Sequence, residues 1–257
     1  MLRRFGWIPD LPDVRDKVYL RSIQPTALPS KAMVPALPRI SDQGQLGSCT
    51  GNATASACEA QLRAAGIDVD LSRLFAYYGG RRREGSVGSD AGAMIRDVIK
   101  GVVEDGLPSE TTWPYDVSRF ADSPSTAAMV EAARHRATAY HRCSSVWDIK
   151  DAIAKGQPVV IGFTVYDSFG SAGATGIYPQ PSGGVRGGHA VCVVGYDDAA
   201  NMPWGGPGAL WIANSWGPRW GIPAPGAPTA GFFLMPYGVV QDPNLADDFW
   251  AVTVGGL

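Results

Sequence analysis

The amino-acid sequence predicts an α+β fold with two lobes, a mainly helical lobe followed by a mainly β lobe. Alanine-rich and amphipathic segments between residues 49 and 103 favour helices. After residue 157, short β-branched or aromatic runs alternate with segments rich in glycine and proline, which is typical of strands and loops. Six prolines among the first 40 residues exclude helices from the start of the chain.

The helical and β segments can be placed in order along the chain. Helices are expected at Cys49–Ala65, Leu71–Arg82, Ala91–Val103, Pro124–Arg136 and Val146–Lys155. Ser123 is the expected N-cap of the fourth helix, because proline is favoured at the first helical position. Strands are expected at Pro158–Val165, His189–Tyr196, Ala209–Asn214 and Gly231–Met235.

These elements predict a folded domain over residues 28–257, with the helical lobe at about 41–120 and the β lobe at about 121–257. Residues 1–27 form an N-terminal extension or short propeptide. The part from Gly6 to Asp13 is extended, partly apolar and stiffened by proline, which suits docking against a groove. We expect the extension to lie across or beside a cleft and restrain activity; a segment that only covers one lobe is the alternative.

Charge and hydropathy exclude several classes of protein. The chain has 22 basic and 24 acidic residues and no block of like charge, so neither nucleic acid nor a membrane is an expected partner. The longest apolar stretches, such as Pro158–Phe163, are too short to cross a bilayer. No apolar signal segment follows Arg3 and Arg4, so a cytoplasmic location or export by another route is expected. The protein is expected to be a monomer.

One of the four cysteines stands out by its position. Cys58, Cys143 and Cys192 are expected to be small buried apolar residues, because the spacings fit neither a zinc site nor a disulfide framework. Cys49 opens a predicted helix, whose N-terminus lowers a thiol pKa, and the glycine-containing segment before it lets a substrate approach. Cys49 is therefore the candidate nucleophile, and no metal or cofactor is implied.

A thiol nucleophile needs a base, and the chain has three histidines. His135 and His141 are expected at the surface. His189 follows two glycines and precedes an apolar strand, which places an imidazole at a sheet edge where a loop can open a site. A purely structural histidine, satisfied by a backbone carbonyl, is the alternative at this position.

Asn214 follows a hydrophobic strand and comes with two tryptophans, Trp216 and Trp220. A buried amide must find hydrogen-bond partners, and a histidine ring nitrogen would serve. The amide would then fix the imidazole tautomer, as a carboxylate does in a serine triad. A turn residue beside core tryptophans is the alternative interpretation of this segment.

Three segments together resemble the papain family of cysteine peptidases. They are Gln43–Cys49, Gly188–Tyr196 and Asn214–Gly221, in the chain order of the family's glutamine, cysteine, histidine and asparagine motifs. The resemblance implies the papain-like two-lobed fold, with the active-site cleft between the lobes. It also implies an oxyanion hole made by the Gln43 side chain and the Cys49 N–H, and a Trp216 ring that shields the hydrogen bond between the asparagine and the histidine.

The resemblance also suggests a substrate-binding surface that includes Trp216, Gly188 and Asp247. Asp247 is matched to the pocket for the second residue before the scissile bond, where a carboxylate would favour arginine or lysine. Two solvated acids in a surface turn are the alternative for Asp247 and Asp248.

Departures from the plant and lysosomal members point to the bacterial branch of the family. Leu46 and Thr50 stand where those members carry a cysteine and a tryptophan, so their disulfides are not expected. Their long helical propeptide is absent, and only residues 1–27 remain to silence a zymogen.

The resulting hypothesis is a cysteine peptidase that hydrolyses peptide bonds through a thioester acyl-enzyme. Cys49 attacks, His189 transfers protons, Asn214 orients the imidazole and Gln43 binds the oxyanion. A peptide or protein substrate is the expected partner. Two alternatives remain: a catalytically silent peptide-binding protein of the same fold, and an acyl or amide transferase that uses the same thioester.

Overall fold

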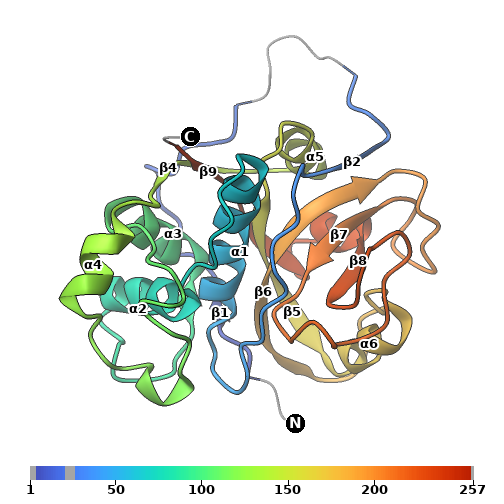
Figure 1. Ribbon diagram of the computed structural model, residues 1–257. Coiled ribbons are helices and arrows are strands. Elements are labelled where there is room, and N and C mark those ends of the chain that lie inside the picture. Colours follow the sequence, from blue (N-terminus) through green and yellow to red (C-terminus); the bar gives the residue numbers. More distant parts are fainter. Residues whose placement is uncertain (1–3, 21–26, 256–257) are drawn as a thin grey trace.

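The computed structural model describes residues 4–20 and 27–255, with helices gathered on one side and strands on the other (Figure 1). The α+β two-lobed fold is confirmed. The helices are α1 (Cys49–Ala64), α2 (Arg73–Glu84), α3 (Ile95–Glu104), α4 (Thr126–Ala132), α5 (Val146–Ala154), α6 (Ala172–Thr175) and α7 (Tyr237–Gln241), with 3-10 turns at Val117–Arg119 and Asp167–Ser171. The strands are β1 (Trp7–Ile8), β2 (Lys31–Met33), β3 (Ala93–Met94), β4 (Ala137–Arg142), β5 (Val159–Tyr166), β6 (Val185–Asp197), β7 (Ala209–Ala213), β8 (Phe232–Pro236) and β9 (Ala246–Val254).

The main sheet is antiparallel and has the strand order β4-β9-β5-β6-β7-β8, with β2 paired to β6. Its longest strand, β6, pairs with three neighbours, and His189 on β6 stands opposite Phe163 on β5. The run from Val159 to Phe163 is buried at every position, as expected for a strand covered on both faces. The sheet therefore holds His189 on a rigid support.

Helix α1 is the element that joins the two lobes. It packs against α2 on one side and against β6 and β9 on the other (Figure 1). Most of its residues are buried, and the buried apolar ones are mainly alanines. Small residues let the neighbouring backbones approach: a Cβ at Gly51 would lie 2.7 Å from the Arg73 carbonyl oxygen of α2. The close packing fixes the start of α1, where Cys49 lies.

Residues 4–19, here called the strap, run between the lobes. Strand β1 pairs in parallel with β3, so that Trp7 stands opposite Ala93. Farther along, Val18 bridges to Arg142, and the Tyr19 hydroxyl donates to Asp151 at 2.9 Å. Trp7 is only 9% exposed, so this part of the extension is packed into the molecule.

Three local features differ from the sequence-based expectation. Helix α3 begins at Ile95 and not at residue 91, because Ala93 and Met94 pair with the strap. Helix α4 is capped by Ser125, whose hydroxyl accepts from the Ala128 N–H, while Ser123 hydrogen bonds to a tyrosine hydroxyl. Strand β9 was not expected, because two acidic residues follow its first residue, Ala246.

The described residues contain no helix long and apolar enough to cross a membrane. Within the same ranges, no group of three or more His, Cys, Asp and Glu side chains is arranged to hold a metal ion. All four cysteines are buried and free, which confirms the expectation for Cys58, Cys143 and Cys192.

Replacing Gly51 with alanine is expected to destabilise the fold by about 2 kcal/mol, because the added methyl would collide with α2 backbone atoms. Gly170→Ala is the matched control, since a Cβ there meets no atom within 4 Å. Urea unfolding followed by tryptophan fluorescence measures both variants. Equal stability of Gly51→Ala and the wild type would contradict the close packing of α1 and α2.

Candidate active site

Cys49 is the first residue of α1 and is fully buried. Its predecessor, Ser48, is the N-cap residue, but the Ser48 hydroxyl does not cap the helix and instead contacts the Tyr115 hydroxyl and the Asn52 side-chain amide. The backbone N–H groups of Thr50 and of Cys49 itself favour the ionised sulfur and lower the pKa of the thiol. The helix start therefore points its donors at the thiol, as the sequence predicts.

Burial nevertheless raises the pKa of the Cys49 thiol to about 11. Hydrogen bonds from the backbone N–H groups of Ala190, Gly6, Thr50 and Cys49 lower the pKa but do not offset the loss of solvent. The helix N-terminus was expected to favour a thiolate, and the difference comes from the cover over the sulfur. Gly6 belongs to the strap, so the strap contributes to this cover.

His189 and Asn214 form a buried hydrogen-bonded pair. Nε2 of His189 lies 2.9 Å from Oδ1 of Asn214, which also accepts from the Ser215 N–H at 2.9 Å. Because Oδ1 also accepts from a backbone N–H, the amide oxygen faces the imidazole, and Nε2 of His189 carries a hydrogen and donates to it. His189 comes from β6 and Asn214 from the end of β7, and neighbouring strands thus bring together residues that are 25 positions apart.

The Trp216 ring lies beside the imidazole. The centroids of the Trp216 and His189 rings are 5.1 Å apart, with 31° between the ring planes. Trp216 itself packs edge-on against Trp220 and Phe169, and it is only 8% exposed. This arrangement is the one that the resemblance implies for shielding the hydrogen bond between His189 and Asn214.

The Gln43 side chain is fully buried, and its orientation is fixed by its partners. Its Nε2 donates to the carbonyl oxygens of Leu46, at 2.9 Å, and Arg4, at 3.1 Å. Its Oε1 accepts from the Ser215 hydroxyl at 2.7 Å. Since carbonyl oxygens only accept, Nε2 must face Arg4, a residue of the strap.

The strap passes directly over these residues. Phe5 stands edge-on to His189 at 6.1 Å between ring centroids and also contacts Trp216. Gly6 lies so close to the body that a Cβ there would be 1.7 Å from the Gly47 carbonyl oxygen, and its own carbonyl accepts from the Ala93 N–H. The cleft beside Cys49 is thus filled by backbone.

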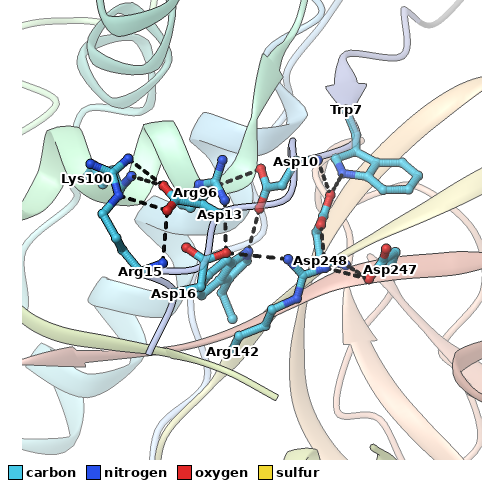
Figure 2. Close-up of polar contacts among 11 residues, drawn as sticks. Trp7, Asp10, Asp13, Arg15, Asp16, Arg96, Lys100, Arg142, Asp247 and Asp248 are labelled. Atoms are coloured by element: carbon cyan, nitrogen blue, oxygen red, sulfur yellow. Dashed lines mark hydrogen bonds and ion pairs between the residues drawn. The ribbon is translucent and has the colours of Figure 1, made fainter. Parts of the chain in front are cut away.

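A network of acids and basic residues anchors the strap (Figure 2). Asp10 accepts from the Trp250 indole at 2.8 Å and from the Arg96 backbone N–H, and its own N–H donates to Asp248 at 2.8 Å. Asp16 forms an ion pair with Arg96 at 2.9 Å. Burial, followed by the negative charge of Asp248, raises the pKa of Asp10 to about 7.

The remaining candidates differ in whether they contact the strap. Gly188 lines the path of the strap, because a Cβ there would be 2.5 Å from the Trp7 carbonyl oxygen. The Asp247 side chain is 53% exposed and forms an ion pair with Arg142. The acid that faces Trp7 is its buried neighbour Asp248, whereas the sequence-based prediction named Asp247 as the pocket residue. His141 packs beside Tyr19, away from the site.

A family model described as papain family cysteine protease matches residues 25–241. A peptidase C1-like protein of Acanthamoeba polyphaga mimivirus is 35% identical over 97% of this chain and 86% of its own length. The crystal structure of xylellain, a cysteine protease from Xylella fastidiosa, is 34% identical and covers 98% of each chain with a TM-score of 0.85. Procathepsin B S9 from Trypanosoma congolense, 20% identical over 98% of this chain and 87% of its own, shares the fold with a TM-score of 0.76. The chain therefore belongs to the papain family of cysteine proteases, which are hydrolases that act on peptide substrates.

Proposed function

We propose that this protease cleaves peptide bonds with Cys49 as nucleophile, His189 as proton carrier, Asn214 as the residue that orients His189, and Gln43 as an oxyanion donor. The observation that carries the proposal is a peptide backbone already seated at these residues. The Arg4 carbonyl oxygen accepts from the Gln43 amide at 3.1 Å, and the Gly6 backbone is one of the groups that act on the Cys49 thiol and lower its pKa. A substrate carbonyl in the place of Arg4 would meet the same donor.

Acylation begins when the thiol proton passes to His189. Because Nε2 is held by Asn214, the proton must go to Nδ1. The sulfur then bonds to the carbonyl carbon, and the Gln43 side chain with the Cys49 N–H stabilises the oxyanion. The tetrahedral intermediate collapses as His189 protonates the departing amine, which leaves a thioester on Cys49.

Deacylation uses the same residues in reverse roles. Water attacks the thioester carbon while His189 takes a proton from the water. The C–S bond breaks, the carboxylic acid product departs and the proton returns to the sulfur.

We also propose that residues 1–27 act as an inhibitory extension of a peptidase domain that spans residues 28–257. The strap covers His189 with Phe5 and engages the Gln43 donor through Arg4. It also contributes to a burial that raises the pKa of the Cys49 thiol to about 11, which disfavours the reactive thiolate. Latency therefore has a steric and an electrostatic origin.

Cys49→Ala is expected to abolish peptide cleavage, because it removes the proposed nucleophile. The fold should stay intact, because the start of a helix tolerates alanine with at most a small loss of capping. Hydrolysis of a fluorogenic peptide library measures activity, with Trp7→Ala present in the parent and in every variant to release the strap, and thermal unfolding measures stability. Single alanine variants of Cys58, Cys143 and Cys192 are the controls and should stay within a few-fold of the Trp7→Ala parent. Loss of activity in Cys192→Ala with full activity in Cys49→Ala would refute the assignment.

Trp7→Ala in the full-length chain is expected to speed alkylation of Cys49 by iodoacetamide at least ten-fold. Truncating a buried aromatic anchor removes much of the docking free energy of the strap. Leu11→Ala is the matched control, since Leu11 lies on the same strap but is 67% exposed. Mass spectrometry of the Cys49 peptide gives the rate. Equal rates in the two variants would argue against an inhibitory strap.

The strap is expected to bind more tightly at acidic pH. Its docked Asp10 has a pKa of about 7, above the ordinary aspartate value near 4, so docking takes up a proton between these values. This contribution is fully present below about pH 4 and is lost as the pH rises through 7. The charged groups that face Asp10 are Asp248 and Arg96.

Cys49 alkylation rates between pH 5.5 and 8.5 measure this effect. The thiol's own ionisation also raises the rate with pH, so Asp10→Asn provides the comparison: it lacks the titrating carboxyl. The wild-type rate should rise several-fold more steeply than that of Asp10→Asn. Parallel profiles for the two proteins would show that Asp10 does not control docking.

A further inference from the structure

The two proposed oxyanion donors lie at opposite ends of one short loop. Gln43 supplies its side-chain amide, and Cys49, the first residue of α1, supplies its backbone N–H. Such donors work only when they are held where charge develops in the transition state. The loop contains two glycines, Gly44 and Gly47, whose backbone deforms more easily than that of other residues. The loop by itself is therefore a weak constraint on the spacing of the two donors.

The Tyr115 hydroxyl contacts both ends of this loop. It donates to the Gln43 carbonyl oxygen at 2.9 Å, and it hydrogen bonds to the hydroxyl of Ser48, the residue before Cys49. The phenol has a single hydrogen, which goes to the carbonyl oxygen, so Ser48 is the donor in the second bond. One side chain thus links the residue that carries the amide donor to the residue next to the N–H donor.

Asn52 continues this chain of hydrogen bonds into α1. Its Nδ2 donates to the Ser48 hydroxyl and to the Ser48 carbonyl oxygen, each at 3.0 Å, and its Oδ1 accepts from the Ser41 hydroxyl at 2.8 Å. The Ser48 and Asn52 side chains are fully buried. The bonds therefore run in one direction, from Asn52 through Ser48 and Tyr115 to Gln43, and a satisfied buried network of this kind is rigid.

The helical lobe holds Tyr115 itself in place. Its backbone N–H donates to the Glu110 carboxylate, and the Arg73 guanidinium lies 4.9 Å from the centroid of its ring. Arg73 opens α2 and forms an ion pair with Glu110 at 3.1 Å. Burial raises the pKa of Tyr115 to about 12, so the hydroxyl keeps its proton near neutral pH. The hydroxyl is therefore a fixed donor.

We propose that Tyr115 is a positioning residue of the oxyanion hole, which sets the spacing between the Gln43 amide and the Cys49 N–H without touching the substrate. Ser48 passes the constraint to Cys49 through the peptide bond, and Gln43 receives it at its backbone. Without the hydroxyl, the Gln43 carbonyl oxygen still accepts from the Leu46 N–H at 3.3 Å, but its link to Ser48 is lost. This inference rests on the proposed peptidase function.

Tyr115→Phe, introduced into the Trp7→Ala chain, tests the proposal. Removing an oxyanion donor costs about 100-fold or more in kcat; a displaced donor costs less, so kcat should fall about ten-fold while KM changes less than about two-fold. Tyr196→Phe is the matched control, because its hydroxyl also donates to a backbone carbonyl oxygen, that of Pro29, at 2.8 Å. The control should keep the kcat and KM of the Trp7→Ala parent.

Two thiol reagents separate positioning from general structural damage. When Cys49 adds to a peptide aldehyde, the sulfur bonds to the carbonyl carbon, and the electron pair of the C=O bond moves to the oxygen, which takes the thiol proton. That oxygen lies in the oxyanion hole. When Cys49 reacts with iodoacetamide, the sulfur displaces iodide from a methylene carbon, and no oxygen gains charge.

Tyr115→Phe should therefore weaken binding of the aldehyde about ten-fold and leave the rate of alkylation nearly unchanged. The aldehyde is that of the peptide that the Trp7→Ala parent cleaves best. Equal losses with both reagents would overturn the proposal, because a displaced thiol or a damaged fold affects both. Unchanged affinity for the aldehyde would overturn it as well.

Ser48→Ala breaks the same chain of hydrogen bonds and serves as a second variant if Tyr115→Phe does not fold. It should weaken binding of the aldehyde several-fold more than it slows alkylation, and equal effects would contradict the proposal. Cleavage and aldehyde binding that neither variant weakens refute only the role of Tyr115. Failure of the Trp7→Ala parent to cleave any peptide, together with no alkylation of Cys49, refutes the proposed peptidase function and this inference with it.

Discussion

The packing of α1 against β6 is the constraint on which the rest of the structure depends. Helix α1 brings the thiol from the helical lobe, and β6 brings the imidazole from the sheet. The alanines and Gly51 of α1 have small side chains or none, so the helix can pack closely between α2 and the sheet. Because protein interiors are close-packed, a small displacement of α1 would move the sulfur relative to the histidine.

The residues proposed for catalysis were predictable from sequence because each lies in a short local motif. Cys49 and His189 are each marked by the glycines before them, and Asn214 by the tryptophan that follows at position 216. The pairing of His189 with Asn214 needs only two neighbouring strands. Short motifs and the pairing of neighbouring strands are the features that a sequence pattern predicts best.

The contacts of the strap were not predictable in the same way. Trp7 meets Asp248 across 241 positions of the chain, and no periodic pattern links such distant residues. The same strap shortens α3 by pairing with β3, which is a tertiary override of helix propensity. It also contributes to the burial of Cys49, so the thiol has a raised pKa where the helix N-terminus alone predicts a lowered one. The nearly balanced total charge also gave no sign of the acidic and basic groups around Asp10 and Arg96, because these groups meet only when the chain is folded.

The glycines of the body that face the strap have a consequence for the proposed inhibition. A Cβ at Gly92 would lie 2.4 Å from the Gly6 carbonyl oxygen, and Gly162 and Gly188 face Trp7 just as closely. The surface that receives the strap thus depends on the absence of side chains at these three glycines. A related enzyme with a side chain at any of these positions could not accommodate this strap, however similar its catalytic residues. A free peptide with the strap sequence would accordingly bind some close relatives and not others. Sequence changes in the strap and at the positions that face it must therefore occur together in evolution.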